Sequence, residues 1–125
     1  MNEHGNAAVL LVDDDESSLI LAAKMLKRAG FDHVDTALTG AGALELMRSK
    51  DYRLVISDWN MPGMDGLDLL KIIRADERLS RTPVLMMSID DASERVSRAV
   101  LAGANAFLPK PFDRPTLTAT IEQVL

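Results

Sequence analysis

Carboxylates, a hydroxyl and an ammonium group follow short apolar segments at several places in the sequence. Three aspartates, residues 13–15, come directly after the apolar run Ala8–Val12, and Asp58 follows a second such run. Ser88 and Lys110 follow two later apolar segments. Carboxylates held close together repel one another and raise their own pKa values unless a cation neutralises them. If folding brings these residues together, the sequence predicts an all-oxygen cation site beside a lysine and a hydroxyl.

A hard divalent cation suits such a set of oxygen ligands. Mg²⁺ prefers octahedral oxygen ligands at short distances and usually keeps several waters. Two carboxylates, a backbone carbonyl and waters therefore satisfy its coordination. We expect the protein ligands to be Asp14, Asp58 and the backbone carbonyl of Asn60.

An ionised carboxylate beside Mg²⁺ and a lysine is suited to attack a phosphoryl group. The cations neutralise charge on the transferring oxygens while the carboxylate oxygen attacks in line. We interpret Asp58 as the nucleophile, with Lys110 pairing with the aspartyl phosphate and Ser88 donating a hydrogen bond to another phosphoryl oxygen. Each residue alone has a simpler explanation as a turn former, a helix cap or a solvated lysine. The inference rests on their combination at three strand ends.

Short apolar runs alternate five times with segments of helical periodicity, which predicts a parallel sheet with helices on both faces. We expect one α/β domain of the doubly wound, flavodoxin-like type, with five strands in the order 2-1-3-4-5 and five helices. In such sheets the functional crevice lies beyond the carboxyl ends of the strands. The predicted strands are Ala8–Val12, His33–Ala37, Leu54–Ser57, Val84–Met87 and Ala106–Leu108.

Capping signals mark the ends of the predicted helices. The first helix, Ser17–Ala29, stops at Gly30, a residue suited to the left-handed position after a helix end. The second, third and fifth helices are each preceded by a residue whose side chain can cap a helix N-terminus: Thr39, Asp65 and Asp113. Asp91 and Glu94 have the spacing of a capping box, so we expect the fourth helix to open there and to end at Gly103.

Composition excludes several other classes of protein. The chain has 125 residues, of which 47% are hydrophobic and 26% charged, enough for one core and too few for two ordinary domains. The absence of cysteine excludes thiolate chemistry and favours a reducing, cytoplasmic compartment. A net charge of −5 opposes binding to nucleic acid, and no apolar run is long enough to span a membrane. We expect residues 1–7 to be a flexible tail and residues 8–125 to form the domain.

The residues around Asp58 resemble the receiver domains of two-component response regulators. The most specific stretch is residues 55–66, VISDWNMPGMDG, and the resemblance covers nearly the whole chain. Within this family the chain is most similar to chemotaxis regulators of the CheY type. The resemblance implies that Asp58 is the phosphoacceptor, and that Asp14 binds the metal with Asp13 in a supporting position behind it.

The resemblance also implies roles for the residues at the later strand ends. Ser88 and Lys110 match the hydroxyl and the lysine of the family, and the peptide bond between Lys110 and Pro111 is expected to be cis. A sensor histidine kinase or a histidine phosphotransfer protein is the expected phosphoryl donor. The expected output is the binding of a downstream protein, which the sequence does not name.

A two-position switch is expected to carry the signal to the surface. Phosphorylation should draw Ser88 toward the phosphoryl group, so that the Phe107 ring moves inward and alters the surface of residues 92–102 and 114–125. Chemotaxis regulators have a tyrosine where this chain has Phe107, which cannot hydrogen-bond a partner through a hydroxyl. Ile89 replaces a residue that is usually small, and we expect it either to shield the phosphoryl group or to restrict Ser88.

Other functions stay open as alternatives. Asp13 and Asp15 follow an apolar strand and, with Ser17, form a passable nucleophile signature of a haloacid-dehalogenase-type phosphatase, but the chain offers neither the cap nor the late acidic motif of those enzymes. A degenerate receiver that is never phosphorylated is disfavoured by the intact set of site residues. A phosphorelay intermediate or a phosphoryl sink is the alternative within the receiver family. As a receiver, the chain would be a switch and not a turnover enzyme.

Overall fold

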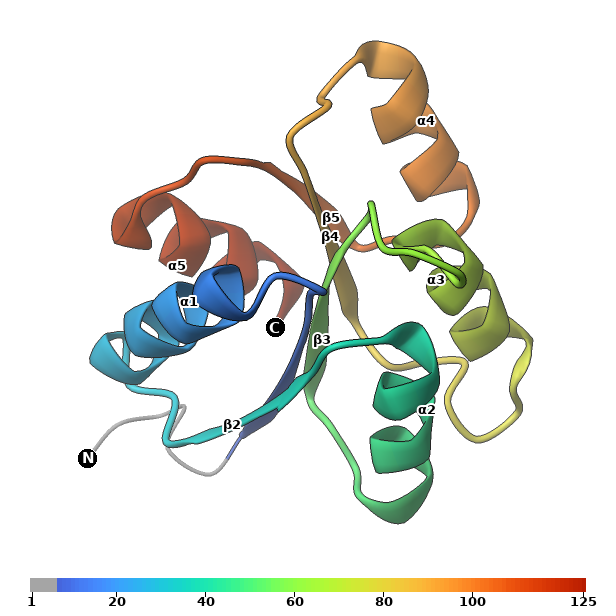
Figure 1. Ribbon diagram of the computed structural model, residues 1–125, viewed down its shortest axis with the longest axis horizontal. Coiled ribbons are helices and arrows are strands. Elements are labelled where there is room, and N and C mark those ends of the chain that lie inside the picture. The colour runs from blue at the N-terminus through green and yellow to red at the C-terminus, as the bar shows by residue number, and fades with distance from the viewer. Residues whose placement is uncertain (1–6) are drawn as a thin grey trace.

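The computed structural model describes residues 7–125, and these residues form a five-stranded parallel sheet with five helices (Figure 1). The strands are β1 Ala8–Val12, β2 His33–Ala37, β3 Leu54–Asp58, β4 Val84–Ser88 and β5 Ala106–Pro109. The helices are α1 Glu16–Arg28, α2 Gly40–Ser49, α3 Gly66–Ala75, α4 Ser93–Leu101 and α5 Arg114–Val124. The strand order β2-β1-β3-β4-β5 confirms the predicted fold class.

Of the predicted tail, residues 1–6 lie outside the described residues. Ala7 is described, and it is buried. The division of the chain into a tail and a domain therefore stays a prediction. No helix among residues 7–125 is long and apolar enough to cross a bilayer.

Two helical layers enclose the sheet. In Figure 1, α1 and α5 cover one face, and α2, α3 and α4 cover the other. Successive side chains of a strand point to opposite faces, so Val9 and Leu11 of β1 pack in the core beside α1 and α5. Leu10 and Val12 pack in the core on the other face. Burial on both faces explains why the central strands consist of nearly continuous apolar residues.

Several predicted helix ends are confirmed. The side chains of Thr39, Asp65 and Asp113 each accept a hydrogen bond from the backbone amide three residues ahead. These bonds satisfy amide groups that would otherwise lack a partner in the first turn of a helix. Gly30 and Gly103 follow α1 and α4 with φ of 103° at both positions, the left-handed region that favours glycine.

The predicted capping box at the start of α4 is wrong. The helix begins at Ser93, with Ala92 in the N-cap position and no side-chain cap. Glu94 is therefore the second residue of the helix, and a capping box requires the third. The Asp90 carboxylate accepts a hydrogen bond from the Ala92 amide at 3.1 Å. The aspartate that organises this turn is thus Asp90 and not Asp91.

Gly66 lets the start of α3 lie directly against the end of β3. Its amide donates a hydrogen bond to the carbonyl of Trp59 at 2.8 Å. A Cβ atom at this position would clash with the carbonyl oxygen of Asp58 and would lie 2.8 Å from the Cα of Trp59. The loop after β3 can therefore fold this closely only around a residue without a side chain.

All five strands are parallel, so their carboxyl ends share one edge of the sheet. Asp13 follows β1, Asp58 and Ser88 are the last residues of β3 and β4, and Lys110 follows β5. The structure thus places the chemically active residues of the sequence on one edge, as predicted from the alternation of strands and helices.

Candidate functional site

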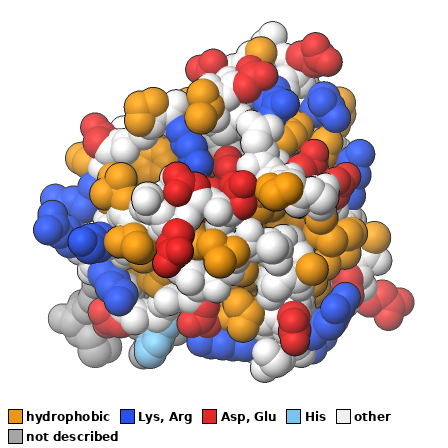
Figure 2. All heavy atoms as spheres, viewed as in Figure 1, with side chains coloured by type: hydrophobic (Ala, Val, Ile, Leu, Met, Phe, Trp, Pro, Cys, Tyr) orange, Lys and Arg blue, Asp and Glu red, His pale blue; other side chains and the backbone are white. Residues whose placement is uncertain are grey.

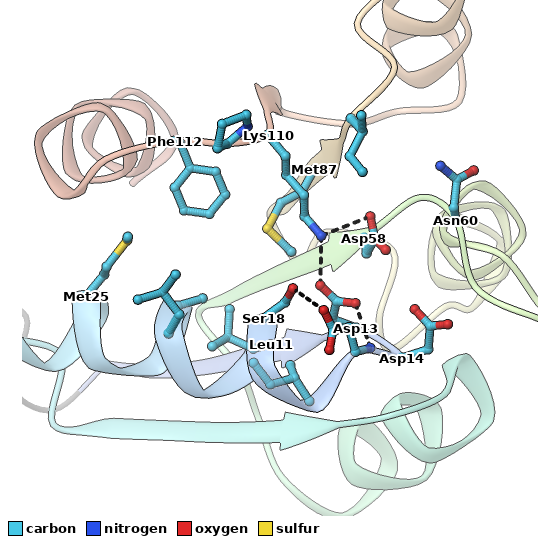
Figure 3. Close-up of a pocket in the computed structure, with 16 residues that line it drawn as sticks. Leu11, Asp13, Asp14, Ser18, Met25, Asp58, Asn60, Met87, Lys110 and Phe112 are labelled. Atoms are coloured by element: carbon cyan, nitrogen blue, oxygen red, sulfur yellow. Dashed lines mark hydrogen bonds and ion pairs between the residues drawn. The ribbon is translucent and has the colours of Figure 1, made fainter.

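A cavity of about 540 Å³ opens at this edge (Figure 3). Apolar side chains of α1 and of the segment before α5 line one part of it. In the space-filling view, acidic side chains gather near the middle of the visible face, with apolar side chains among them (Figure 2). The polar residues that line the cavity include Asp13, Asp14, Asp58, Asn60 and Lys110, together with Asp15 and Ser18 at the start of α1.

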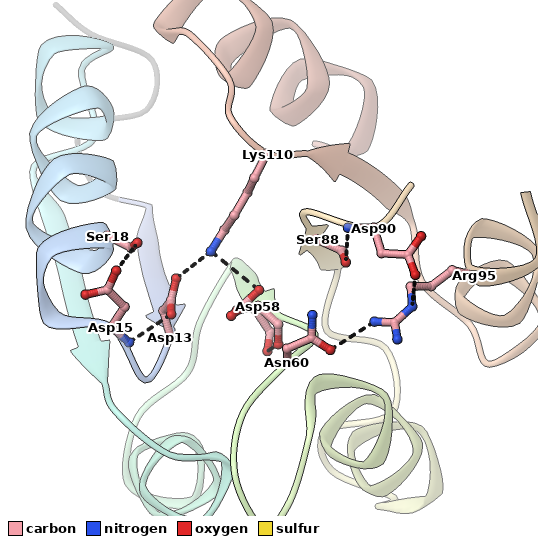
Figure 4. Close-up of polar contacts among 10 residues, drawn as sticks. Asp13, Asp15, Ser18, Asp58, Asn60, Ser88, Asp90, Arg95 and Lys110 are labelled. Atoms are coloured by element: carbon pink, nitrogen blue, oxygen red, sulfur yellow. Dashed lines mark hydrogen bonds and ion pairs between the residues drawn. The ribbon is translucent and has the colours of Figure 1, made fainter. Parts of the chain in front are cut away.

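Lys110 is the cation of this polar group. Its Nζ lies 2.8 Å from Oδ2 of Asp13 and 3.4 Å from Oδ1 of Asp58 (Figure 4). Burial alone lowers the pKa of Lys110, but the hydrogen bond to Asp13 and the charges of the two carboxylates outweigh it, so the pKa of Lys110 is raised. The ammonium group is therefore charged at neutral pH. The peptide bond between Lys110 and Pro111 is cis, as expected.

Asp58 is a buried carboxylate between a positive group, Lys110, and a negative group, Asp13. Its exposed fraction is 7%, and that of Asp13 is 1%. Burial raises the pKa of the Asp58 carboxyl above its ordinary value; the charge of Lys110 opposes this rise and the charge of Asp13 adds to it. A cation close to Asp58 would favour its ionised form further.

The three carboxylates fit a hard divalent cation. Asp13, Asp14 and Asp58 each offer an oxygen, and these atoms all lie within 4.8 Å of one another. Asp13 already accepts hydrogen bonds from Lys110 and from the amide of Asp15. Asp14 is exposed, and among residues 7–125 its carboxylate has no hydrogen-bond or ion-pair partner. Three carboxylates thus face one ammonium group, and their oxygen donors are those that Mg²⁺ prefers.

The structure brings Ser88 and Asn60 to the same edge, but their side chains point to other partners. The Ser88 hydroxyl is buried and accepts a hydrogen bond from the Asp90 amide at 3.1 Å (Figure 4). The side-chain oxygen of Asn60 accepts one from Nη1 of Arg95 at 3.1 Å. Among the described residues, no hydrogen bond joins Ser88 to Asp58.

Arg95 also lies at this edge, and the sequence pattern does not predict it there. Besides the bond to Asn60, its Nε lies 3.4 Å from the Asp90 carboxylate and its Cζ lies 4.4 Å from the centre of the Trp59 ring. Arg95 and Asn60 are 35 residues apart in the sequence. An arginine on an amphipathic helix is ordinarily read as a solvated side chain, so no local pattern marked it.

The profile of the response regulator receiver domain family matches residues 9–122. The chain belongs to the response regulator receiver family. It is 39% identical over 119 residues to the chemotaxis protein CheY-3 of Vibrio cholerae, covering 95% of this chain and 92% of that protein. It is 37% identical over 116 residues to the chemotaxis protein CheY of Pseudomonas aeruginosa, covering 93% and 94%.

Solved structures show the same relationship for this receiver domain. The chemotaxis protein CheY4 of Vibrio cholerae matches it with a TM-score of 0.89 and 35% identity, covering 95% of this chain and 98% of that one. The chain is therefore a phosphoacceptor of two-component signalling, and a signalling switch rather than a turnover enzyme. Its acidic triad is typical of the cation site of receivers.

Proposed function

We propose that this receiver domain accepts a phosphoryl group on Asp58 in a Mg²⁺-dependent reaction. The observation that carries the proposal is the place of Asp58: it is buried at the end of β3, 3.4 Å from Lys110 and within 4.8 Å of two further carboxylates. Asp14, Asp58 and the backbone carbonyl of Asn60 would hold Mg²⁺, with Asp13 behind them. A bound Mg²⁺ would supply neutralisation of charge on the phosphoryl oxygens.

The chain's own residues perform the transfer. An oxygen of the Asp58 carboxylate attacks phosphorus, a new P–O bond forms, and the P–N bond to the histidine of the donor breaks, leaving its imidazole free. Lys110 remains charged because the carboxylates raise its pKa. Its ammonium group is within reach to pair with the oxygens of the aspartyl phosphate.

Ser88 and Phe107 would connect this event to the surface. The Ser88 oxygen accepts from the Asp90 amide, and its own proton can be donated to a phosphoryl oxygen. Phe107 is half-buried and packs against the core beneath α3 and α4. An inward shift of the loop after β4 would make room for this ring, and the surface of residues 92–102 and 114–125 would change with it. Ile89, 76% exposed beside the cavity, would shield the phosphoryl group.

Membership in the receiver family implies a histidine kinase or a histidine phosphotransfer protein as the donor. The named chemotaxis proteins among the relatives support a role in chemotaxis, in the cytoplasm, with a downstream protein as target. Phe107 favours a second candidate, a phosphorelay intermediate or phosphoryl sink, because its ring offers no hydroxyl to a target. Phosphotransfer assays with the kinases and phosphotransfer proteins of the source cell distinguish the two.

Acetyl phosphate tests the chemistry without a kinase. With Mg²⁺ it should add a single phosphoryl group to the chain, measured as the mass of the intact protein. Chelation of Mg²⁺ and the substitution Asp58→Asn should each abolish the labelling. Asp15→Asn is the matched control, because Asp15 caps α1 outside the carboxylate group and asparagine can cap as well. Undiminished labelling of Asp58→Asn would overturn the proposal.

A further inference from the structure

We propose that Arg95 is a positioning residue that biases this receiver toward its unphosphorylated conformation. Its guanidinium joins the first turn of α4 to two loops of the site: the loop after β3, through Asn60, and the loop after β4, through Asp90. The proposal rests on the proposed phosphorylation of Asp58 and goes beyond it. Among the described residues, no hydrogen bond or ion pair joins Arg95 to Lys110 or to the carboxylates of Asp13, Asp14 and Asp58.

A single guanidinium makes three kinds of contact here. Nη1 donates to the side-chain oxygen of Asn60 at 3.1 Å, and Nε lies 3.4 Å from the Asp90 carboxylate (Figure 4). The flat face lies over Trp59, with 4.4 Å between Cζ and the ring centre. Only 23% of the Arg95 side chain is exposed. The planar fork of arginine allows these contacts at the same time, which the point charge of a lysine does not.

These contacts form a continuous path between the two loops. The Asp90 amide donates to the Ser88 hydroxyl, the Asp90 carboxylate pairs with Arg95, and Arg95 donates to Asn60. Asn60 is two residues beyond Asp58, and Asp90 is two residues beyond Ser88. If Ser88 is drawn toward a phosphoryl group on Asp58, Asp90 moves with its loop. Arg95 cannot then keep both its hydrogen bond to Asn60 and its ion pair with Asp90.

The bias is expected to be moderate. The ion pair between Arg95 and Asp90 is partly exposed and by itself stabilises the unphosphorylated conformation only a little. The stacking of Arg95 on the buried Trp59 ring stabilises this conformation further. A ligand shifts a conformational equilibrium only by its different affinity for the two states. Loss of contacts made in one state should therefore change the apparent affinity for an activating ligand by about threefold to tenfold.

Arg98 provides a matched control. It lies on the same helix, and its Cζ is 5.6 Å from the centre of the same Trp59 ring. Within the described part of the chain, its guanidinium makes no hydrogen bond or ion pair. Arg98→Met therefore removes the same charge from the same helix and leaves the links to Asn60 and Asp90 intact.

The experiment titrates beryllofluoride, with Mg²⁺, into the wild type, Arg95→Met and Arg98→Met, and follows the Phe107 amide by NMR. Arg95→Met should reach half-saturation at a concentration about threefold to tenfold lower than the wild type, and Arg98→Met within about twofold of it. In an Asp90→Asn background the effect of Arg95→Met should shrink, because one of its partners is already weakened.

The outcomes separate the two proposals. Absence of any chemical-shift change in the wild type, around Asp58 as well as at Phe107, would reject the proposed phosphorylation site. If the wild type responds but Arg95→Met reaches half-saturation at the same or a higher beryllofluoride concentration than the wild type, the role of Arg95 is rejected and the phosphorylation site is not. Urea unfolding checks that the variants fold. If Arg95→Met does not fold, Arg95→Lys takes its place, since lysine keeps the charge but cannot serve both loops, and the same criterion applies.

Discussion

The ammonium group of Lys110 lies 2.8 Å from the carboxylate of Asp13 and 3.4 Å from that of Asp58. The sequence predicts Lys110 as the partner of the aspartyl phosphate. In the unphosphorylated protein, Lys110 is held mainly by Asp13. Both carboxylates are buried, and Lys110 is the positive charge between them. The stability of this edge should therefore depend on Lys110 when no metal is bound.

Lys110→Met should lower the free energy of unfolding by about 2–4 kcal/mol in the presence of a chelator, because two buried carboxylates lose their cation. Mg²⁺ should restore part of this loss. Urea unfolding with and without Mg²⁺ measures both effects. Lys71→Met, at an exposed position on α3, is the control and should change stability by less than about 0.5 kcal/mol. Similar values for the two variants would contradict the role assigned to Lys110.

Gly66→Ala should destabilise the protein by about 2 kcal/mol or more, because the new Cβ clashes with the backbone of Asp58 and Trp59, which cannot move aside as the tip of the Met86 side chain can. It should also slow labelling by acetyl phosphate, since relief of the clash displaces Asp58. Gly42→Ala is the comparison: its Cβ would meet only the Thr39 hydroxyl, at 3.1 Å, and Ala37 at 3.9 Å. A loss for Gly66→Ala no greater than for Gly42→Ala would refute the steric argument.

Tyr52 should ionise at a higher pH in the folded protein than in the unfolded chain. Burial raises the pKa of Tyr52 above its ordinary value near 10, and a hydrogen bond of 2.6 Å to the Asp35 carboxylate raises it further. Because the folded state holds the phenolic proton more tightly, the resulting stabilisation is complete below the unfolded pKa and is lost as the pH rises through the folded pKa.

Tyr52 is the single tyrosine of the chain, so tyrosinate absorbance reports on it alone. The absorbance of the folded protein should rise at a higher pH than that of the protein in urea. Asp35→Asn should reduce the difference and leave the part that burial causes. Coincident titrations of the folded and unfolded wild type would show that this contact is absent in solution.

Asp90→Ala should destabilise the protein by about 0.5–1.5 kcal/mol, because the amide of Ala92 and the guanidinium of Arg95 both lose a partner. Asp91→Ala should be nearly neutral. Thermal or urea unfolding of the two variants distinguishes the structure from the capping box predicted from the sequence. The reverse order of the two effects would restore Asp91 as the cap.

The predictable part of the site follows from the parallel sheet. Alternating apolar runs and helical segments indicate parallel strands, and parallel strands carry the residues that follow them to one edge. Asp13, Asp58 and Lys110 could therefore be grouped without a structure. The apolar runs predict the ends of β3, β4 and β5 one residue early, at positions 57, 87 and 108, whereas the strands end at Asp58, Ser88 and Pro109. Backbone pairing does not depend on side-chain polarity, and all three residues still pair with the neighbouring strand.

The unpredicted part lies in the turn between β4 and α4 and in its contact with the loop after β3, where the Asn60 side chain accepts a hydrogen bond from Arg95. The spacing of Asp91 and Glu94 predicts a capping box at the start of α4, whereas the turn is organised by Asp90, which also contacts Arg95. The present direction of the Ser88 hydroxyl, toward the Asp90 amide, depends on the same turn. The spacing of the acidic residues alone does not show whether Asp90 or Asp91 pairs with Arg95, because this depends on how α4 packs against the loop after β3.

The position of the phosphoryl group tests the central claim most directly. After treatment with acetyl phosphate and Mg²⁺, borohydride reduction converts an aspartyl phosphate to homoserine, which peptide mass spectrometry locates in the sequence. The modification should appear at position 58 and at no other aspartate, and it should be absent without Mg²⁺. Homoserine at position 13 or 14 in place of 58, or an unmodified chain, would contradict the account.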